Sequence, residues 1–236
     1  TVLADFQPFD AGFLGGISVA VGNFDRDRAV EIVVGAGADG GPRVSIFEIA
    51  DGVATLLPGT LGNFFAFEPS FRGGVSVAAG DLDGDGIDEL IVGAGPGGGP
   101  HVRVFSADGT VLAQWFAFDP AFTGGAFVAA GDLDGDGRAE IVVGAGPGGG
   151  PRVQVFGGTA FPELASFYAT VESDTSGVRP SVADGDGDWN NEVIVLSASP
   201  SDPTAVSPVR AIRILPTGIA TFETFGPPLA GGVAFA

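Results

Sequence analysis

The sequence predicts an all-β protein, a β-propeller built from four-stranded antiparallel blades. The 236 residues include 41 Gly and 17 Pro, yet 45% of them are hydrophobic, a composition that argues against disorder and for a fold rich in turns. A sequence repeat recurs about every 50 residues, which is a blade period. Each repeat reads as short strands separated by turns, without helical periodicity.

The repeat is clearest in the middle of the chain. Residues 72–105 and 123–156 are identical at 25 of 34 aligned positions, and the same frame fits residues 14–47. The fit is looser from Val178 onward. The acidic clusters begin at Asn23, Asp81, Asp132 and Asp184, spaced by 58, 51 and 52 residues. A stacked β-solenoid or a chain of sandwiches is the alternative, disfavoured because solenoid repeats are usually shorter and sandwich strands do not repeat in sequence.

Each strand of one repeat is predicted by its residue types. Val, Ile and aromatic residues fill the segments, and Gly, Pro and Asp separate them. The run GAGPGGGP at 93–100 can only be a turn. The expected strands are 75–79, 89–92, 102–105 and 111–118.

The chain is expected to be a single propeller domain, or a fragment of one, spanning 1–236. Its repeats are approximately 1–48, 54–107, 110–157, 160–214 and a partial 216–236.

The two ends of the chain bear on ring closure. Residues 1–16 align with 110–125, so the chain should begin on a fourth strand, and 222–236 align with 115–129, so it should end on a first strand. This predicts five blades, the fifth incomplete or closed by a strand from the other end of the chain. An interrupted larger array is one alternative. Pairing by a neighbouring chain is the other, because open strand edges require partners.

One acidic loop in each repeat predicts a metal site. Asp residues alternate with small residues, and a Glu follows at the ninth position. Carboxylates brought toward one point repel each other and need a cation. All-oxygen sites of this kind favour Ca²⁺, with Mg²⁺ as the weaker alternative, and we expect three to four sites. The predicted ligands, with a backbone carbonyl at the seventh position, are Asn23, Asp25, Asp27, Ala29 and Glu31; Asp81, Asp83, Asp85, Ile87 and Glu89; Asp132, Asp134, Asp136, Arg138 and Glu140; Asp184, Asp186, Asp188, Asn190 and Glu192.

These loops are not EF-hands, whose last acid stands at position 12 between helices, whereas here it opens a strand. The first loop has Arg26 and Arg28 where the second and third have glycines, so it should bind the cation most weakly. Trp189 replaces a glycine in the fourth loop and predicts a different geometry there.

The order of these features resembles the FG-GAP repeat of integrin α-chain propellers and their bacterial relatives. An aromatic and Gly-rich strand, a DxDGDG loop, a hydrophobic strand and GAGPGGGP follow one another. The resemblance implies calcium loops between the first and second strands of each blade, all on one face. It also implies an opposite face that, in integrins, takes part in partner recognition. This chain departs from the family in having Glu at loop position nine, where integrins favour Asp, and in lacking the bulk of a seven-bladed domain.

Three basic residues are candidates for partner binding. Arg43, His101 and Arg152 each follow a Gly-Pro in successive repeats, and the implied topology places them on the face away from calcium. Such a ring could hold an acidic glycan or a carboxylate of a protein partner. The alternative is that they merely begin a strand and pair locally. The aromatic residues Phe116, Phe118 and Phe122 are expected to be wedges between blades rather than a sugar platform.

Charge and composition exclude several classes of function. The net charge is −19 with ten Arg and no Lys, so neither nucleic acid nor an anionic membrane surface is an expected partner. No apolar run approaches the ~20 residues of a membrane span. The absence of Cys excludes disulfides, thiolate zinc sites and a cysteine nucleophile. His101 is the only histidine, and no GxSxG motif accompanies it.

Together these observations predict a non-catalytic, calcium-stabilised adhesion or recognition module that binds a glycan or an extracellular protein. The alternative is a structural component of a surface or matrix that self-associates through its terminal strands, and a hydrolase or lyase is less favoured. Without any Met, Thr1 is not expected to be a translation start, which suits a processed segment. The expected location is extracellular or at the cell surface.

Overall fold

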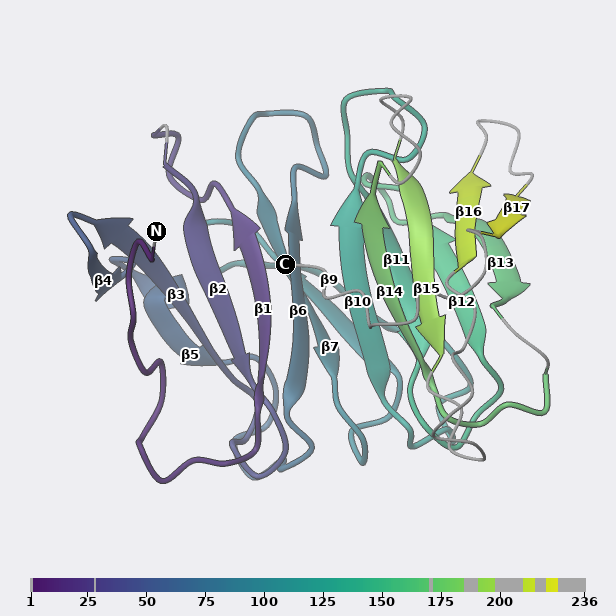
Figure 1. Ribbon diagram of the computed structural model, residues 1–236, viewed down its shortest axis with the longest axis horizontal. Helices are drawn as coiled ribbons and strands as arrows, with labels where there is room; N and C mark the ends of the chain where they lie inside the picture. Colours follow the sequence, from purple (N-terminus) through teal and green to yellow (C-terminus); the bar gives the residue numbers. More distant parts are fainter. Residues whose placement is uncertain are drawn as a thin grey trace.

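The computed structural model is an all-β fold whose sheets stand side by side along the chain (Figure 1). It describes residues 2–27, 29–169, 172–184, 191–197, 210–214 and 220–224. The single helical element among them is the three-residue 3₁₀ turn η1 (Thr60–Gly62). No helix in this part of the chain is long and apolar enough to cross a membrane.

Four antiparallel sheets, the blades, follow one another in chain order. Blade 1 holds β1 (Ile17–Gly22), β2 (Glu31–Ala36), β3 (Arg43–Ala50), β4 (Val53–Leu56) and β5 (Asn63–Phe65). Blade 2 holds β6 (Val75–Gly80), β7 (Glu89–Ala94), β8 (His101–Phe105) and β9 (Val111–Phe116). Blade 3 holds β10 (Ala126–Gly131), β11 (Glu140–Ala145), β12 (Arg152–Phe156) and β13 (Glu163–Tyr168). Blade 4 holds β14 (Val178–Ala183), β15 (Glu192–Ser197), β16 (Arg210–Ile214) and β17 (Ala220–Thr224). The predicted four-stranded antiparallel blades are confirmed.

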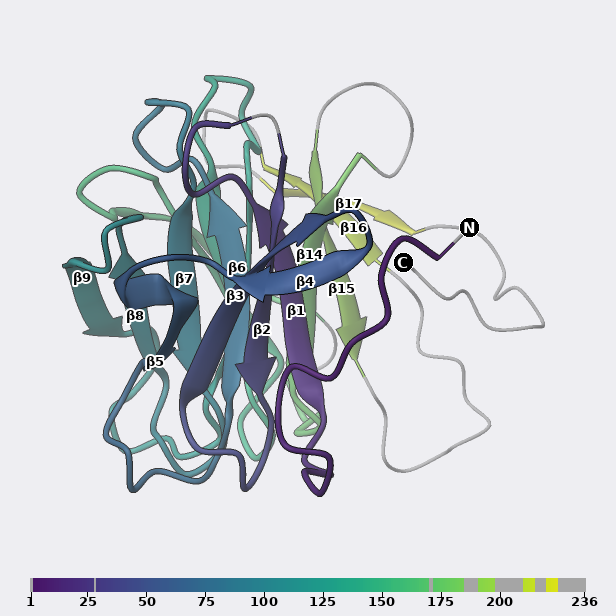
Figure 2. The ribbon, with the colours of Figure 1, turned by 90° about the vertical axis from the view of Figure 1, so that its left-hand side faces the viewer.

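The antiparallel order separates two kinds of connection. The acidic loops join the first and second strands of the blades, and the glycine-rich turns of blades 1 to 3 join their second and third strands. Because consecutive strands run in opposite directions, the two kinds of loop lie at opposite ends of the sheets (Figures 1 and 2). Any acidic cluster is therefore far from Arg43, His101 and Arg152, which begin third strands.

Blade 1 differs from the others in its outer edge. Both β4 and β5 pair with β3, with η1 between them, so the outer position is shared by two short strands. This extra segment explains why the first two acidic clusters are 58 residues apart, whereas the next two are 51 apart.

The structure corrects one expectation about the ends. Residues 2–16 form no strand, although a fourth strand was predicted there. A fourth strand needs the edge of a third strand. The repeat frame provides none in the fifth blade that this segment was expected to join, and β4 and β5 occupy that edge of β3 in blade 1. The segment instead packs against blade 1, with the rings of Phe6 and Phe47 4.9 Å apart. β17 completes blade 4 beyond the expected repeat boundary at 214, which follows a third strand as the boundaries at 107 and 157 do. Residues 225–236, where a first strand of a fifth blade was expected, lie outside the described residues.

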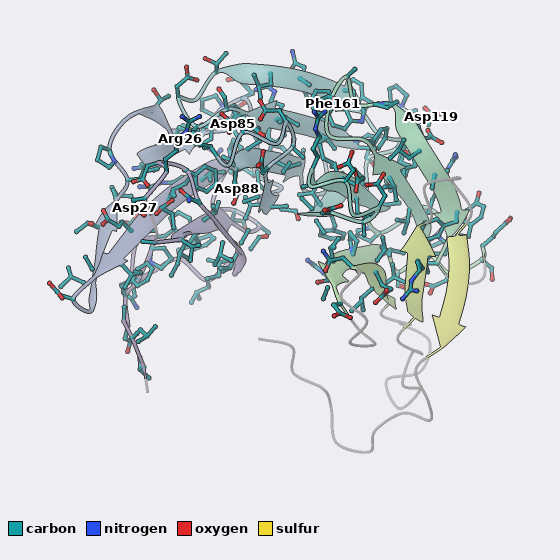
Figure 3. All side chains as sticks on the ribbon, turned by 90° about the horizontal axis from the view of Figure 1, so that it is seen from above. Arg26, Asp27, Asp85, Asp88, Asp119 and Phe161 are labelled. Carbon is teal, nitrogen blue, oxygen red and sulfur yellow. The ribbon has the colours of Figure 1, made fainter. Side chains whose placement is uncertain are left out.

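The core lies between blades, which follow an arc when seen from above (Figure 3). Each of three buried clusters joins two consecutive blades: Val33 and Ile46 pack with Val77 and Leu90, for example. A glycine in the second strands of blades 1 to 3 permits the close approach. A Cβ at Gly93 would lie 2.4 Å from the carbonyl oxygen of Ala126 in the next blade.

We therefore expect Gly93→Ala to destabilise the protein by about 2 kcal/mol, the usual cost of overpacking a close interface. Urea unfolding followed by circular dichroism measures the change. Gly12→Ala is the matched control, since a Cβ there meets nothing within 4 Å. Equal midpoints for both variants would show that blades 2 and 3 are not packed so closely.

Candidate metal centres

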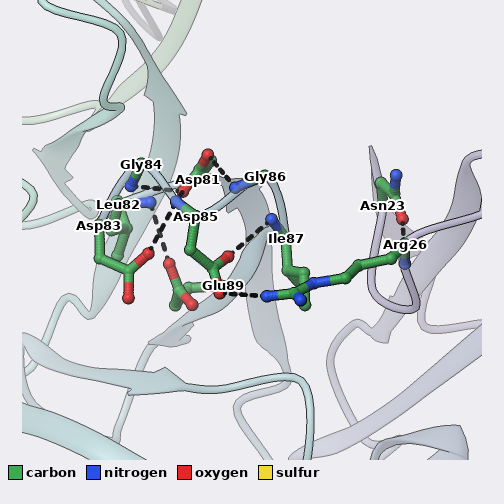
Figure 4. A network of polar contacts seen from close by, with 10 residues as sticks. All are labelled: Asn23, Arg26, Asp81, Leu82, Asp83, Gly84, Asp85, Gly86, Ile87 and Glu89. Atoms are coloured by element: carbon green, nitrogen blue, oxygen red, sulfur yellow. Dashed lines mark hydrogen bonds and ion pairs between the residues drawn. The ribbon is translucent and has the colours of Figure 1, made fainter.

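The second acidic loop is folded around its own carboxylates (Figure 4). Asp81 accepts backbone N–H bonds from Gly84 at 2.7 Å and Gly86 at 2.8 Å, and Asp83 accepts one from Asp85 at 3.1 Å. Gly84 has φ +81°, in the left-handed region that favours glycine. The result is that one oxygen from each of the three Asp side chains lies within 4.8 Å of the others.

The third loop repeats this geometry. Asp132 accepts from the N–H groups of Gly135 at 2.7 Å and Gly137 at 2.9 Å, and Asp134 accepts from Asp136 at 3.1 Å. Its three Asp oxygens again lie within 4.8 Å of one another. The near-identical sequences of the two loops thus produce the same arrangement twice.

The Glu at the ninth position of each of these loops is buried beside the Asp cluster. Oε2 of Glu89 accepts from the N–H of Leu82 at 2.9 Å, and Oε2 of Glu140 accepts from Leu133 at 2.8 Å. Burial, together with the charges of the three neighbouring Asp residues, raises the pKa of Glu89 to about 7, and the same causes raise the pKa of Glu140 to about 7. Both sites carry negative charge in excess.

The first loop holds a buried carboxylate oxygen with no partner. Asp25, Asp27 and Glu31 present oxygens within 4.8 Å of one another. Glu31 is fully buried, and its Oε2 accepts from the N–H of Phe24 at 2.7 Å, whereas Oε1 has no hydrogen-bond partner. Burial, and then the charges of Asp25, Asp27 and Glu48, raise the pKa of Glu31. A buried unpaired oxygen among other acids is costly unless a cation meets it.

Arg26 of the first loop reaches the second loop. Arg26 adopts φ +66° at the position that Gly84 occupies in the next repeat. Its Nη2 lies 2.8 Å from Oδ2 of Asp85 (Figures 3 and 4). The positive charge that was expected to weaken the first loop is thus directed at its neighbour. The ranking of the first loop below the second and third stays a prediction, and Arg28 lies outside the described residues.

The fourth loop is described only at its two ends. Asp184 follows β14 and Glu192 begins β15, while Asp186, Asp188, Trp189 and Asn190 lie outside the described residues. Glu192 is buried, and its Oε1 accepts from Nη2 of Arg213 at 2.9 Å.

Neighbouring blades tie the acidic loops together. The carbonyl oxygen of Asn23 accepts from the N–H of Asp88 at 2.7 Å, and that of Asp81 accepts from Ala139 at 2.8 Å. The carbonyl of Asp132 accepts from the side chain of Asn191 at 3.0 Å. The backbone at the first position of three loops is therefore held by the following blade, which sequence spacing did not reveal.

The geometry of the first three loops fits calcium. Ca²⁺ binds oxygens at about 2.3–2.6 Å, so ligands on opposite sides of one ion lie roughly 5 Å apart. Oxygens within 4.8 Å of one another satisfy that limit, and the donors are hard carboxylates. The N–H groups at the seventh position, those of Ala29, Ile87 and Arg138, each donate to the Asp two residues earlier. The ligand role of their carbonyls stays a prediction.

Comparison with known proteins agrees with the repeat and the fold. The model of the FG-GAP-like repeat family matches residues 81–143, which include the second and third acidic loops. The chain thus carries an FG-GAP-like repeat within a β-propeller fold. It is 40% identical to integrin alpha-5 of Xenopus laevis over 83 residues, which are 34% of this chain and 7% of that protein. It is 27% identical to integrin alpha-PS2 of Drosophila melanogaster over 183 residues, which are 67% of this chain and 12% of that protein. The chain thus spans only a small part of either relative.

Solved structures share the fold. A rhamnogalacturonan lyase of Bacillus licheniformis, PL11, superimposes with a TM-score of 0.53 at 17% identity, covering 83% of this chain and 46% of the lyase. The exotype rhamnogalacturonan lyase YesX gives a TM-score of 0.51 at 17% identity, covering 76% of this chain and 39% of the lyase. At such identity the likeness concerns the fold alone.

At the opposite end of the blades, the three basic candidates have local contacts. Nε of Arg43 donates to Oδ1 of Asn63 at 2.9 Å, and Nε of Arg152 donates to Oγ of Ser166 at 2.9 Å. The ring of His101 lies 5.1 Å from that of Phe67 and 4.9 Å from that of Phe116. Burial, and then the nearby Arg103, lower the pKa of His101. The three residues begin equivalent strands, and their role toward a partner stays a prediction.

The aromatic residues of this end divide into two kinds. Phe122 packs on glycines of its own blade, with ring atoms 2.2 Å from a Cβ placed at Gly124 and 2.7 Å from one at Gly149. Phe118 lies edge-on to it at 6.4 Å. Phe116 is 48% exposed beside His101, so the expectation that it wedges between blades was wrong. It stands in the outer strand β9, whose alternate side chains face solvent.

Proposed function

We propose that this FG-GAP protein is a calcium-stabilised adhesion or recognition module that binds a glycan or a protein partner and catalyses no reaction. The observation that carries the proposal is the recurrence of one acidic cluster in the first three blades, with the unpartnered buried oxygen of Glu31 in one of them. The matches to integrin α-chains support the same assignment.

Calcium would stabilise the fold of the blades. The Asp and Glu side chains of the first three acidic loops would hold the ions, and the positive charge would offset the repulsion between those carboxylates. The backbone ties from Asn23 to Asp88 and from Asp81 to Ala139 connect each loop to the next blade. Filling the loops would therefore stiffen the junctions between blades.

The opposite end of the blades would present the partner surface. It carries a guanidinium at Arg43 and Arg152, an imidazole at His101, and half-exposed aromatic rings at Phe65 and Phe116. Guanidinium groups pair with carboxylates in a bidentate manner, and exposed aromatic faces suit sugar rings or apolar side chains. An acidic glycan or an acidic protein surface fits this set.

We place this activity outside the cytosol. Loops of this acidic type in extracellular modules fill at about 10⁻⁴–10⁻³ M calcium. A net charge of −19 keeps such a domain soluble and away from nucleic acid. The integrin relatives point the same way.

The absence of catalysis rests on the surroundings of His101. Its ring lies between two aromatic rings, and its pKa is lowered by burial. The likeness to rhamnogalacturonan lyases concerns the fold and brings no catalytic group with it.

The test is a binding screen in calcium buffer against glycan arrays and extracellular protein fragments. Replacing Arg43, His101 and Arg152 together by Ala should weaken binding at least tenfold, because charge-assisted contacts contribute about 1.5–3 kcal/mol each. The control is Asp51→Asn, in the exposed turn between β3 and β4, at the other end of the sheet from Arg43. The calcium-dependent melting temperature should stay unchanged in the triple variant. Unchanged binding would move the partner surface elsewhere.

A second candidate, self-assembly, is favoured by the free face of β1. Ile17, Val19 and Val21 are 52%, 54% and 60% exposed, whereas the equivalent Val75 and Val77 of β6 are buried against blade 1. Light scattering of the same preparations separates the two candidates, since self-assembly gives a mass that rises with protein concentration.

A further inference from the structure

One register position in the third strands carries opposite charges in different blades. In each blade, the residue after the buried Glu pairs with an apolar residue of the third strand, as Ile32 pairs with Phe47 and Val193 with Ile212. The residue that follows this apolar partner is therefore equivalent in all four blades. It is Glu48 in blade 1, Ser106 in blade 2, Gly157 in blade 3 and Arg213 in blade 4.

In blade 4 this position supplies a counter-charge to the buried Glu. Nη2 of Arg213 lies 2.9 Å from Oε1 of Glu192, and Nε lies 3.2 Å from the same oxygen. The Glu192 side chain is 4% exposed and that of Arg213 is 26% exposed. Two N–H donors and a full positive charge thus meet one oxygen of a buried carboxylate.

The other three blades lack this arrangement within the described part of the chain. There, no arginine lies within ion-pair distance of Glu31, Glu89 or Glu140. Ser106 and Gly157 bring no charge, and Glu48 adds a negative charge near Glu31. Arg213 contacts Oε1 of Glu192 in blade 4. The corresponding oxygen in blade 1, Oε1 of Glu31, has no hydrogen-bond partner.

We propose that Arg213 takes the place of calcium for Glu192, so that blade 4 folds without the ion while blades 1 to 3 depend on it. This inference rests on the proposed calcium function. The guanidinium already occupies the carboxylate oxygen that a metal would need, and its charge repels a divalent cation nearby. Arg213 is a positioning residue for Glu192, and the fourth loop then has a much lower affinity for calcium than the first three.

The experiment compares the wild type with Arg213→Gln by calorimetric calcium titration and by melting in EGTA and in 10 mM CaCl₂. The wild type should bind three calcium ions. Arg213→Gln should melt several degrees lower in EGTA, because a buried carboxylate loses its partner. Calcium should restore most of that loss, with one further ion bound. Arg210→Gln, which removes one charge from the same strand, is the matched control and should gain no ion.

The double variant Glu192→Gln with Arg213→Gln keeps the inference testable if the single variant fails to fold. It removes both charges, so it should fold in EGTA and bind three ions. Four equal sites in the wild type would overturn the inference. The inference would also be overturned if Arg213→Gln lowered the melting temperature equally in EGTA and in calcium and bound no further ion. Should the wild type bind no calcium, the proposed function fails as well, and a double-mutant cycle in EGTA would then report the Arg213–Glu192 coupling by itself.

Discussion

Removing calcium is expected to lower the melting temperature of this protein by roughly 10 °C. A ligand that binds only the folded state stabilises it by RT ln(1 + [L]/Kd), which is about 1.4 kcal/mol for a site with a Kd of about 1 mM in 10 mM calcium. Three such sites contribute about 4 kcal/mol, and each kcal/mol shifts the melting temperature of a domain of this size by about 2–4 °C.

Calorimetric melting in 10 mM CaCl₂ and in EGTA measures this effect, with MgCl₂ as the control for ionic strength and divalent charge. Asp83→Asn and Asp134→Asn should each remove about a third of the calcium-dependent shift, since each weakens one of two equivalent loops. Asp51→Asn should remove none. Superimposable curves in calcium and EGTA would contradict the metal assignment for all three loops.

The fold could be predicted because the blades repeat in sequence. The two segments with 25 identities in 34 positions determine the frame, and segments of Val, Ile and aromatic residues between Gly, Pro and Asp determine the strands. The ends were less predictable, because a segment that resembles a fourth strand forms one only where the edge of a third strand is available. Residues 2–16 illustrate this, because the repeat frame provides no third strand in the fifth blade they were expected to join, and β4 and β5 occupy the edge of β3.

The acidic clusters could be predicted for a similar reason. Three Asp residues alternate within a single turn, so their proximity depends on local chain geometry alone. Contacts between blades depend on which residues the packing brings together across 50 or more positions. The Arg26–Asp85 pair and the ties to Asp88, Ala139 and Asn191 are of this kind. Arg213 could have been singled out only by aligning third strands, where it replaces Glu48, Ser106 and Gly157.

The calcium-free protein should lose stability as the pH rises from about 4.5 to about 7. The pKa of Glu89 and of Glu140 is about 7 in the folded protein, against an ordinary value of 4.5. Between these values the folded state holds two protons that the unfolded state has released. The slope of stability against pH is proportional to the protons bound by the unfolded state minus those bound by the folded state. This difference is negative here, so stability falls as the pH rises. Each side chain contributes on the order of 3 kcal/mol over this interval.

Urea unfolding of metal-stripped protein between pH 4.5 and 7.5 measures the slope, and calcium should reverse it. The ion needs ionised carboxylates, so its stabilising effect grows as Glu89 and Glu140 lose their protons. Replacing both by Gln should flatten the pH dependence without calcium, because neither side chain can then titrate. Glu68→Gln, at an exposed loop position, is the control and should leave the slope intact. Stability that rises across this interval in the calcium-free wild type would show that both glutamates are already ionised in the folded protein.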